Sequence, residues 1–514
     1  MTSASSASGT ARPAGAGSTT VRREPGTAGR TIGRKQGGVT APERHRDSLY
    51  APREPIYPKL AHGRFRRIKW AVMIVTLSVY YLLPWLRWDR GPNAPDQAVL
   101  LDLPGRRFYF FWIEIWPQEV YYVTGLLILG ALALFLVTAL FGRVWCGYAC
   151  PQTVWTDLFI HVERWIQGDR NKRIRLDRQP WTVEKIWKKG LTHLIWLAIA
   201  VATGGAWVFY FADAPTLAQE LITGTAPLPA YIAIGAFTFT TYTLGGLMRE
   251  QVCIYMCPWP RIQGAMFDEY TLLVSYDEQR GEPRGPHKKG ESWEGRGDCV
   301  DCKQCVAVCP MGIDIRNGPQ LECIQCALCI DACDAIMDKV GRPRGLIRYA
   351  TLATSSGERL AFKPIRPRTL IYAGLIALVG GIMLFGLLTR ADVGLNVLHD
   401  RNPLYVRLSD GSIRNGYVIK VLNKAHEERR FHLSLSGLPD HTLVRPFAKG
   451  DPAILTVGPD AVGEFRLYVR VPRDAARTLA AQGHEATILF AVRDPISGAQ
   501  ARRESVFTLP AHLR

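Results

Sequence analysis

The segment that decides the fold reads CVDCKQCVAVCP at residues 299–310, and CIQCALCIDAC follows it at 323–333. Each run places three cysteines with two residues between neighbours and a fourth after three more residues, which is a spacing of [4Fe–4S] ligands. In such paired runs the fourth cysteine ligates the cluster of the other run. We therefore expect two [4Fe–4S] clusters, one held by Cys299, Cys302, Cys305 and Cys333 and the other by Cys323, Cys326, Cys329 and Cys309.

Zinc is the alternative metal for these eight cysteines. Zinc sites usually combine two separated pairs, whereas each run here is a triplet followed by a more distant fourth cysteine. The spacing therefore favours clusters and predicts a ferredoxin-like domain at 276–345 that carries electrons. The sequence has no C-x-x-C-H motif, no G-x-G-x-x-G after a strand and no G-x-x-x-x-G-K-[ST]. We therefore expect the electrons to come from a separate donor.

Four further cysteines form a repeated motif. WCGYACPQ at 145–152 and VCIYMCPWP at 252–260 both read C-x-Y-x-C-P, with an offset of 107 residues. At i and i+4 on one helix the two sulfurs of each motif would share a face, and the proline would end or bend that helix. Two facing motifs predict a pocket of four thiolates, made by Cys146, Cys150, Cys253 and Cys257.

Three interpretations of this pocket stay open. Soft thiolates select Cu(I), an iron–sulfur cluster or zinc, so a copper or other redox role and a third cluster both fit. Free cysteines are also often inert and buried, which makes structural packing the third interpretation. Because the whole pattern is duplicated, we favour the redox role, with copper first.

The composition indicates several units, some of them in a membrane. The chain has 514 residues, a formal net charge of +18 and 47% hydrophobic residues. The apolar residues concentrate in long blocks with basic segments between them, which indicates charged loops beside membrane spans and not a nucleic-acid surface. All 12 cysteines lie between Cys146 and Cys333. This crowding is typical of metal ligands in a reducing compartment and not of a disulfide framework.

Five blocks are long enough to cross a bilayer, at 70–88, 120–141, 191–211, 230–247 and 370–388. The Lys and Arg counts of the flanking segments alternate: 14 in 1–69, three in 89–119, ten in 142–190, none in 212–229 and seven in 342–369. Basic loops stay inside, so this alternation predicts a cytoplasmic N-terminus, a cytoplasmic eight-cysteine segment and an external C-terminus.

The segments outside the spans predict the remaining domains. Residues 1–48 are rich in Ala, Gly, Ser and Thr with scattered Arg, which is typical of a disordered basic tail. The membrane domain, with four helices and both C-x3-C-P motifs, then covers 49–275, and a basic linker with the fifth helix covers 346–390. Residues 391–514 contain about seven short strand patterns, including a hairpin at 404–423, which predicts an immunoglobulin-like β-sandwich.

A few other polar residues are weaker candidates. His161 and His193 lie near the cysteine motifs and the third span, but a lone histidine is more often structural than a ligand. Glu114 and Glu119 lie in the aromatic stretch before the second span. Their carboxylates could attract a cation, although solvation at the membrane interface accounts for them adequately.

The order of these features resembles the FixG/CcoG family of cytochrome c oxidase accessory proteins, over roughly residues 50–514. The twelve cysteines carry the resemblance, together with IWPQE at 115–119, GDRNKRIRLD at 168–177 and DRNPLYVRLSDGSIRNGY at 400–417. The paired C-x3-C-P and two-cluster module taken alone also resembles membrane electron-transfer subunits of nitrate and nitrous oxide reduction systems.

The resemblance implies a polytopic protein of the bacterial inner membrane with a periplasmic C-terminal domain. It implies a cupric reductase that turns Cu(II) into Cu(I) for a cbb-type cytochrome c oxidase, with that oxidase, its copper-delivery factors and a cytoplasmic electron donor as partners. It also implies that the C-x3-C-P cysteines handle copper or electrons. Two alternatives are a redox-sensing assembly scaffold without activity and a quinol-linked conduit to a periplasmic reductase.

Overall fold

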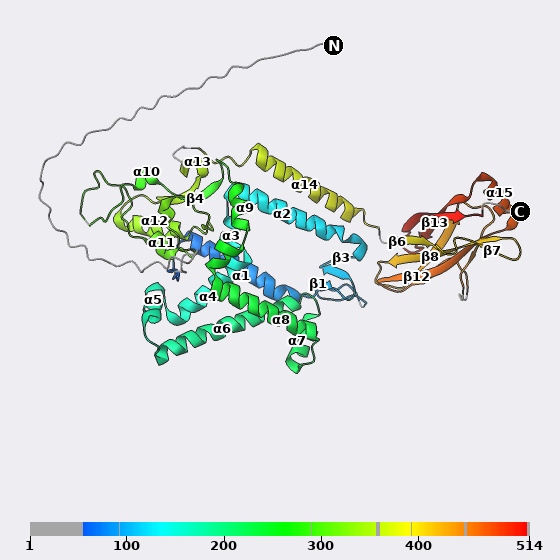
Figure 1. Cartoon of the computed structure of the whole chain (residues 1–514), viewed down its shortest axis with the longest axis horizontal. Coiled ribbons are helices and arrows are strands. Elements are labelled where there is room, and N and C mark those ends of the chain that lie inside the picture. The colour runs from blue at the N-terminus through cyan, green and yellow to red at the C-terminus, as the bar shows by residue number, and fades with distance from the viewer. Residues whose placement is uncertain are drawn as a thin grey trace, which may run out of the picture. The chain divides into compact units, whose positions relative to one another are not determined.

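A computed structural model describes residues 55–91, 93–288, 290–355, 360–391, 393–446 and 450–510. The chain divides into two units, Met1–Pro55 and Ile56–Arg514, and every element below belongs to the second. The tail predicted at 1–48 lies outside the described residues, so its disorder stays a prediction. The second unit contains a helical region, a cysteine-rich region and a C-terminal β-domain (Figure 1).

Four helices in the described part of the chain are long and apolar enough to cross a membrane. They are α1 (Arg64–Leu82), α2 (Tyr121–Phe141), α6 (Val183–Val208) and α14 (Pro367–Leu388). These helices correspond to four of the five blocks read from the sequence. The third begins eight residues earlier than 191, because the hydroxyl of Thr182 accepts the N–H of Lys185 and caps the first turn of α6.

The fifth candidate span is irregular. α7 (Ala214–Thr223) and the helix that runs from Leu228 to Met248 are bent by 91° at a short break, so they form either one broken span or a re-entrant loop. The second of these helices begins as α8 (Leu228–Thr240) and continues as the π-helix η3 (Thr241–Met248). The π-helix η3 leads to the second C-x3-C-P motif. Such π-helical turns are frequent at functional sites.

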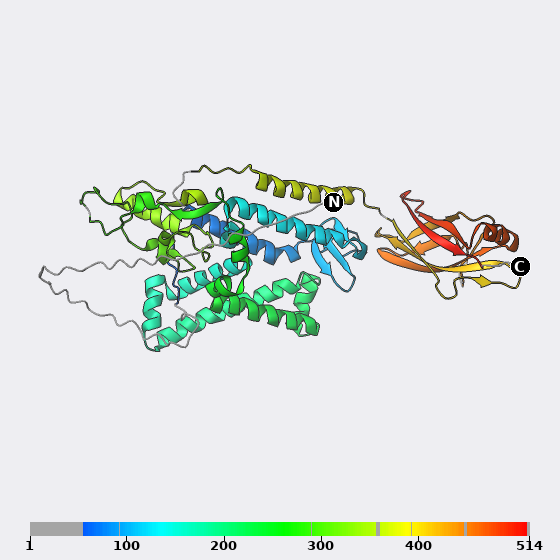
Figure 2. The ribbon, with the colours of Figure 1, turned by 45° about the horizontal axis from the view of Figure 1, so that its top comes forward.

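Small residues let the long helices approach one another closely. α2 and α14 lie side by side in both views (Figures 1 and 2). Gly125 on α2 faces Met383 on α14, and Gly386 on α14 faces Tyr122 on α2. On the other side of the helical region, Gly204 of α6 lies against the backbone of Ile234 on α8. Close contacts at small residues are the usual means of helix association in a bilayer, where hydrophobicity alone does not drive it.

Shorter helices follow α2 and η3 along the chain. They are α3 (Val144–Tyr148), α4 (Pro151–Gln167), α5 (Arg170–Arg178), the π-helical turn η4 (Val252–Met256) and α9 (Trp259–Ala265). Single 3-10 turns, η1 (Leu83–Trp85) and η2 (Pro117–Glu119), flank a small antiparallel sheet. That sheet has the order β1–β2–β3, from Val99–Asp102, Arg107–Phe110 and Ile113–Ile115. This sheet was not predicted from the sequence.

The cysteine-rich region has its own small core. Its elements are β4 (Leu272–Tyr276), α10 (Glu278–Gly281), α11 (Gln304–Val308), η5 (Ile315–Asn317), α12 (Leu328–Val340), β5 (Ile347–Thr351) and α13 (Leu352–Ser355). β4 and β5 pair antiparallel. The carboxylate of Asp331 on α12 accepts the backbone N–H groups of Phe65 and Arg66 at 3.1 and 2.7 Å. Asp331, more than 260 residues away in sequence, thereby caps the N-terminus of α1 and joins the cysteine-rich region to this helix.

The C-terminal domain is a sandwich of two antiparallel sheets. One sheet has the order β10–β12–β8–β6 with β7 paired to β8, and the other has the order β11–β9–β13–β14. Their bounds are β6 Val393–His399, β7 Val406–Arg407, β8 Ile413–Asn423, β9 Arg429–Ser436, β10 Thr442–Val444, β11 Ile454–Val457, β12 Ala461–Val471, β13 Glu485–Arg493 and β14 Gln500–Thr508. Helix α15 (Arg473–Gln482) connects the two sheets.

Alternation of apolar and polar residues produces the core of this sandwich. Side chains from both sheets meet in a single buried cluster, which includes Tyr417, Phe431, Leu467 and Phe490. The predicted hairpin at 404–423 is present, with β7 and β8 joined through Gly411 at φ 82°. β6 and β10 are strands that the sequence analysis missed. The predicted fold class, a helical membrane domain with a ferredoxin-like region and an Ig-like β-sandwich, is confirmed.

Candidate metal centres

The two cysteine runs adopt the same loop conformation. In each run the residues on both sides of the second cysteine have left-handed backbone angles: Asp301 and Lys303 at φ 49° and 52°, Gln325 and Ala327 at 56° and 59°. Residues other than glycine rarely adopt these angles. Such alternation turns successive N–H groups toward one point, a concavity that is typical of anion and iron–sulfur sites. Both loops therefore have the backbone shape of a cluster site.

The eight thiols fall into the two expected sets. Burial raises the pKa of Cys333 to about 12, and the neighbouring thiols that add to this rise are Cys305, Cys299 and Cys302. Burial also raises the pKa of Cys309 to about 12, and there the neighbours are Cys326 and Cys323. Each fourth cysteine thus lies beside the triplet of the other run. The structure brings the residues together as the crossed pairing requires.

The spacing of the sulfurs fits a cluster better than a single ion. Within the described residues, which include all twelve cysteines, no three cysteine sulfurs lie within 4.8 Å of one another. Around one zinc ion with Zn–S bonds of about 2.3 Å, the sulfurs of a tetrahedral site would be about 4 Å apart. A cluster bonds each sulfur to a different iron, so its ligands stand farther apart. The eight cysteines therefore fit two clusters and not two zinc ions.

The C-x3-C-P motifs do not lie on single helices, which corrects one expectation. Cys146 lies in α3, but Cys150 is extended, with ψ 128°, and precedes α4. Cys253 lies in η4, and Cys257 follows it with ψ 121°. A residue before proline is disfavoured in the helical region, while proline suits the first turn of the next helix. Pro151 begins α4 and Pro258 directly precedes α9, so the second cysteine of each motif lies in a break between helices.

The four C-x3-C-P thiols are nevertheless neighbours. Burial raises the pKa of Cys253 to about 12, and Cys150, Cys146 and Cys257 add to the rise. Cys146 donates from Sγ to Gln263 Oε1 over 3.2 Å. No three of these sulfurs lie within 4.8 Å either, in the part of the chain that is described. Two-thiolate coordination of Cu(I) and a third cluster both remain compatible with this spacing.

The first C-x3-C-P motif packs directly against the second cysteine run. A Cβ atom on Gly147 would lie 2.6 Å from the carbonyl oxygen of Ile324 and 3.0 Å from the Cα of Cys326. The hydroxyl of Tyr148 donates to the carbonyl of Cys326 over 3.1 Å. The backbone N–H of Arg143 donates to Gln325 Oε1 over 3.0 Å. The four-thiol pocket and one cluster loop thus share an interface without any intervening side chain at Gly147.

Comparison with known proteins identifies the family. Residues 123–173 match a 4Fe–4S binding domain, residues 248–352 a 4Fe–4S dicluster domain, and residues 383–510 the Ig-like fold at the C-terminus of FixG. Nitrogen fixation protein FixG of Rhizobium meliloti is 53% identical over 93% of this chain and 97% of its own length. The chain belongs to the FixG family. Its predicted iron–sulfur and redox character is thereby confirmed.

Other FixG-family members are equally similar. Protein RdxB of Cereibacter sphaeroides is 53% identical over 91% of this chain and 99% of its own length. Protein RdxA of the same organism is 55% identical over 83% of this chain and 91% of its own length. A FixG-related protein from Vibrio parahaemolyticus has a crystal structure that aligns with 23% of this chain over 96% of its own length. The sequence identity is 23% and the TM-score is 0.20.

Two histidines singled out from the sequence have structural surroundings. His193 on α6 shares a hydrogen bond of 2.9 Å with the hydroxyl of Tyr242 on η3. His161 on α4 is exposed and its ring meets the edge of Trp70 at a centroid distance of 6.1 Å. Neither belongs to a group of three ligand atoms around one point among the described residues. The structural interpretation of both histidines is therefore favoured in this FixG-family chain.

The two glutamates before the second span were misinterpreted. Glu114 and Glu119 are 8% and 6% exposed, so solvation at an interface does not account for them. Glu119 forms ion pairs of 2.9 Å with Arg390 and 2.8 Å with Lys424. These partners are 271 and 305 residues away, so no local sequence signal indicated them. Gly147 and Gln263 were also missed as contributors. For Gly147 the available signal was its difference from Ile254 at the matching position of the repeat.

The contact at Gly147 yields a prediction about this FixG-family protein. Gly147→Ala must push apart the backbones of α3 and the second cysteine run, because the nearest atoms belong to main chain. We expect a loss of about 1–3 kcal/mol of stability, the usual cost of overpacking. Thermal unfolding of the detergent-solubilised chain measures it.

Gly130→Ala is the matched control, because a Cβ atom at Gly130 on α2 meets nothing within 4 Å. We expect the unfolding temperature of this control to stay close to that of the unmodified chain. Equal unfolding temperatures for the two variants would contradict the close packing at Gly147.

Proposed function

We propose that this protein is a membrane-bound cupric reductase, which converts Cu(II) to Cu(I) for the copper centre of a cbb-type cytochrome c oxidase. The family membership supports iron–sulfur redox activity, and the proposal adds the substrate. The ligands are Cys299, Cys302, Cys305 and Cys333 for one cluster, Cys309, Cys323, Cys326 and Cys329 for the other, and Cys146, Cys150, Cys253 and Cys257 for copper. Bound [4Fe–4S] clusters would supply single electrons at low potential.

The observation that carries the proposal is the packing of Gly147 against Cys326. It joins a pocket of four soft ligands to a loop shaped for a cluster. The hydroxyl of Tyr148 donates to the backbone of Cys326 and the backbone N–H of Arg143 donates to the side chain of Gln325, and these two bonds tie the pocket to the loop. Cys326 of the loop nearest the pocket is buried, and Cys309, Cys323 and Cys329 around it are half-buried, so water has little access to this set. A short, fixed and dry path is what single-electron transfer to the thiols needs.

The opposite edge of the cysteine-rich region suits the entry of electrons. Cys302 is exposed, while Cys299 and Cys305 of the same set are buried. Exposed Lys303 lies beside it. A donor protein that presents an acidic surface would approach this edge with favourable electrostatics. We infer that the electrons enter at the set that contains Cys302 and leave through the set that contains Cys326.

Thiolates at the exit favour the product over the substrate. Cu(I) prefers soft sulfur ligands, whereas Cu(II) prefers nitrogen and oxygen. A copper ion held by Cys146, Cys150, Cys253 and Cys257 is therefore easier to reduce there than in water. Each Cu(II) takes one electron, so the donor must supply one electron per Cu(I) formed. The third-cluster interpretation of these four thiols is the alternative.

The alternation of basic loops supports the proposed topology. Accordingly the protein crosses the bacterial inner membrane several times, with its N-terminus and cysteine-rich region in the cytoplasm and its β-domain in the periplasm. The proposed partners are the cbb-type oxidase, its copper-delivery factors and a cytoplasmic electron donor. Accessibility of a single cysteine introduced into the loop at 439–441 to an impermeant reagent tests the side of the β-domain.

A single-turnover measurement tests the activity. The full chain is reduced without oxygen, excess reductant is removed, and Cu(II) is added with a Cu(I)-specific chelator. We expect about two Cu(I) per chain, one electron from each cluster. A quinol offered in place of the reductant should leave the clusters oxidised, because the proposed electron donor is a cytoplasmic protein. Reduction by quinol without copper reduction would favour the conduit, and no redox exchange with copper would favour the scaffold.

A further inference from the structure

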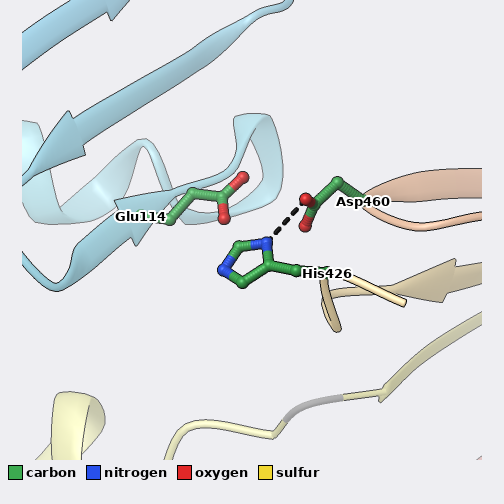
Figure 3. A group of neighbouring side chains, drawn as sticks. All are labelled: Glu114, His426 and Asp460. Carbon is green, nitrogen blue, oxygen red and sulfur yellow. Dashed lines mark hydrogen bonds and ion pairs between the residues drawn. The ribbon is translucent and has the colours of Figure 1, made fainter. Parts of the chain in front are cut away.

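Three potential metal ligands meet where the small β1–β3 sheet contacts the C-terminal domain (Figure 3). Glu114 lies on β3, His426 lies in the loop between β8 and β9, and Asp460 directly precedes β12. One ligand atom from each lies within 4.8 Å of the other two. In the close-up the carboxylates of Glu114 and Asp460 both lie above the His426 ring, with Asp460 to the right of Glu114. This spacing differs from that of the cysteines and suits one ion.

Two buried oxygens in this group are not hydrogen-bonded. Glu114 and Asp460 are 8% and 6% exposed, and Glu114 Oε1 and Asp460 Oδ1 have no hydrogen-bond partner. The nearest cation to the glutamate is Arg107, whose Nη1 lies 3.5 Å from Oε1. The other oxygen of Asp460 shares a hydrogen bond of 2.6 Å with His426 Nδ1. A buried carboxylate oxygen without a hydrogen bond is costly, and the single charge of Arg107 does not balance the two carboxylates.

The backbone holds these ligands in place. Asp460 has φ 48°, and its N–H donates to the carbonyl of Ala425 over 3.0 Å. Its own carbonyl accepts from the guanidinium of Arg107. Asn93 Nδ2 donates to the carbonyl of His426 over 2.9 Å. Arg107 thus binds the main chain of Asp460 and leaves its side chain free to face Glu114 and His426.

We propose that Glu114, His426 and Asp460 bind a divalent transition-metal ion, and that among such ions Cu²⁺ binds most tightly. One imidazole and two carboxylates suit zinc and other divalent transition metals, and the Irving–Williams order puts Cu²⁺ first. The two carboxylates outweigh the single charge of Arg107 and compensate the ion.

This site is separate from the four thiols. Glu114 precedes α2, and Cys146 follows it, so the 21 residues of α2 separate them by about 30 Å at 1.5 Å per residue. The inference therefore does not rest on the proposed reduction. Its consequence is mechanical as well as chemical: the ligands come from both the β1–β3 sheet and the C-terminal domain, so the ion ties them together.

Copper binding to the full chain tests the site. The protein carries Cys146→Ser and Cys253→Ser, has its clusters oxidised, and is titrated with Cu²⁺ while the electron paramagnetic resonance spectrum is recorded. We expect one Cu²⁺ per chain with coupling to a single imidazole nitrogen. His426→Asn should weaken binding more than tenfold, since even residues that only support a ligand cost 10–100-fold. His432→Asn, at an exposed histidine on β9, is the control and should change nothing.

A second variant guards against misfolding of the loop. Glu114→Gln lies on β3, outside the C-terminal domain, and should produce the same loss of affinity with the β-domain intact. Zn²⁺ should raise the unfolding temperature of the unmodified chain but not that of either variant, by linkage. If His426→Asn and Glu114→Gln bind Cu²⁺ with unchanged affinity and spectrum, or if the unmodified ligand set binds none, the proposal is wrong.

Discussion

Copper reduction is expected to disappear when Cys146 and Cys253 are both replaced by serine, while both clusters stay in place. The two substitutions together remove one soft ligand from each C-x3-C-P motif, so neither motif can hold Cu(I) through two sulfurs of its own. None of the eight cluster cysteines is altered. We expect the yield of Cu(I) in a single turnover to fall at least about a hundredfold, as the loss of an essential group commonly does.

Iron content and visible absorbance of the same samples supply the control. They should match those of the unmodified chain if the four thiols hold copper, and iron should fall by about a third if they hold a third cluster. The second control is Met256→Leu, which changes an exposed residue inside the second motif and leaves both cysteines of that motif in place. Full copper reduction by the double cysteine variant would contradict the proposed role of the pocket.

The second large effect concerns the crossed pairing of the cysteine runs. Cys333→Ala should remove the cluster of Cys299, Cys302 and Cys305, although Cys333 belongs to the other run in sequence. Because Cys333 lies beside those three thiols, its loss opens that set and leaves the other intact. We expect iron per chain to fall by about half, from about eight to about four atoms.

Cys309→Ala is the matched variant, since Cys309 lies beside Cys323 and Cys326. This variant should remove the cluster of Cys323, Cys326 and Cys329. Because the loop of Cys326 contacts Gly147, copper reduction should stop as well. The two variants therefore lose equal iron from different sets, which their spectra distinguish. If both variants kept the same cluster and gave the same spectrum, the crossed pairing would be wrong.

Much of the fold could be predicted because its signals are local. The cysteine spacing, the long apolar blocks and the alternation in the β-domain each arise within about 20 residues, and each corresponds to an observed element. The predicted hairpin at 404–423 depended on two alternating runs around Asp410-Gly411, and β7 and β8 pair there. Local patterns also located the twelve cysteines that the structure gathers into three sets.

The remainder depends on contacts distant in sequence. Lys303, Gln325 and Ala327 have left-handed backbone angles that their residue types do not predict. The break between Cys146 and Cys150 could have been predicted from the pre-proline restriction, which the helical interpretation overlooked. The burial of Glu114 depends on His426 and Asp460, more than 300 residues away.

The central claim is that electrons from the clusters reduce Cu(II) at the four thiols. Rapid mixing of the fully reduced, oxygen-free chain with one equivalent of Cu(II) tests it most directly, with cluster absorbance and the Cu(II) resonance signal followed together. The account predicts that the oxidised-cluster absorbance returns with the same rate constant as the Cu(II) signal disappears. Clusters that stay reduced while Cu(II) persists would contradict it.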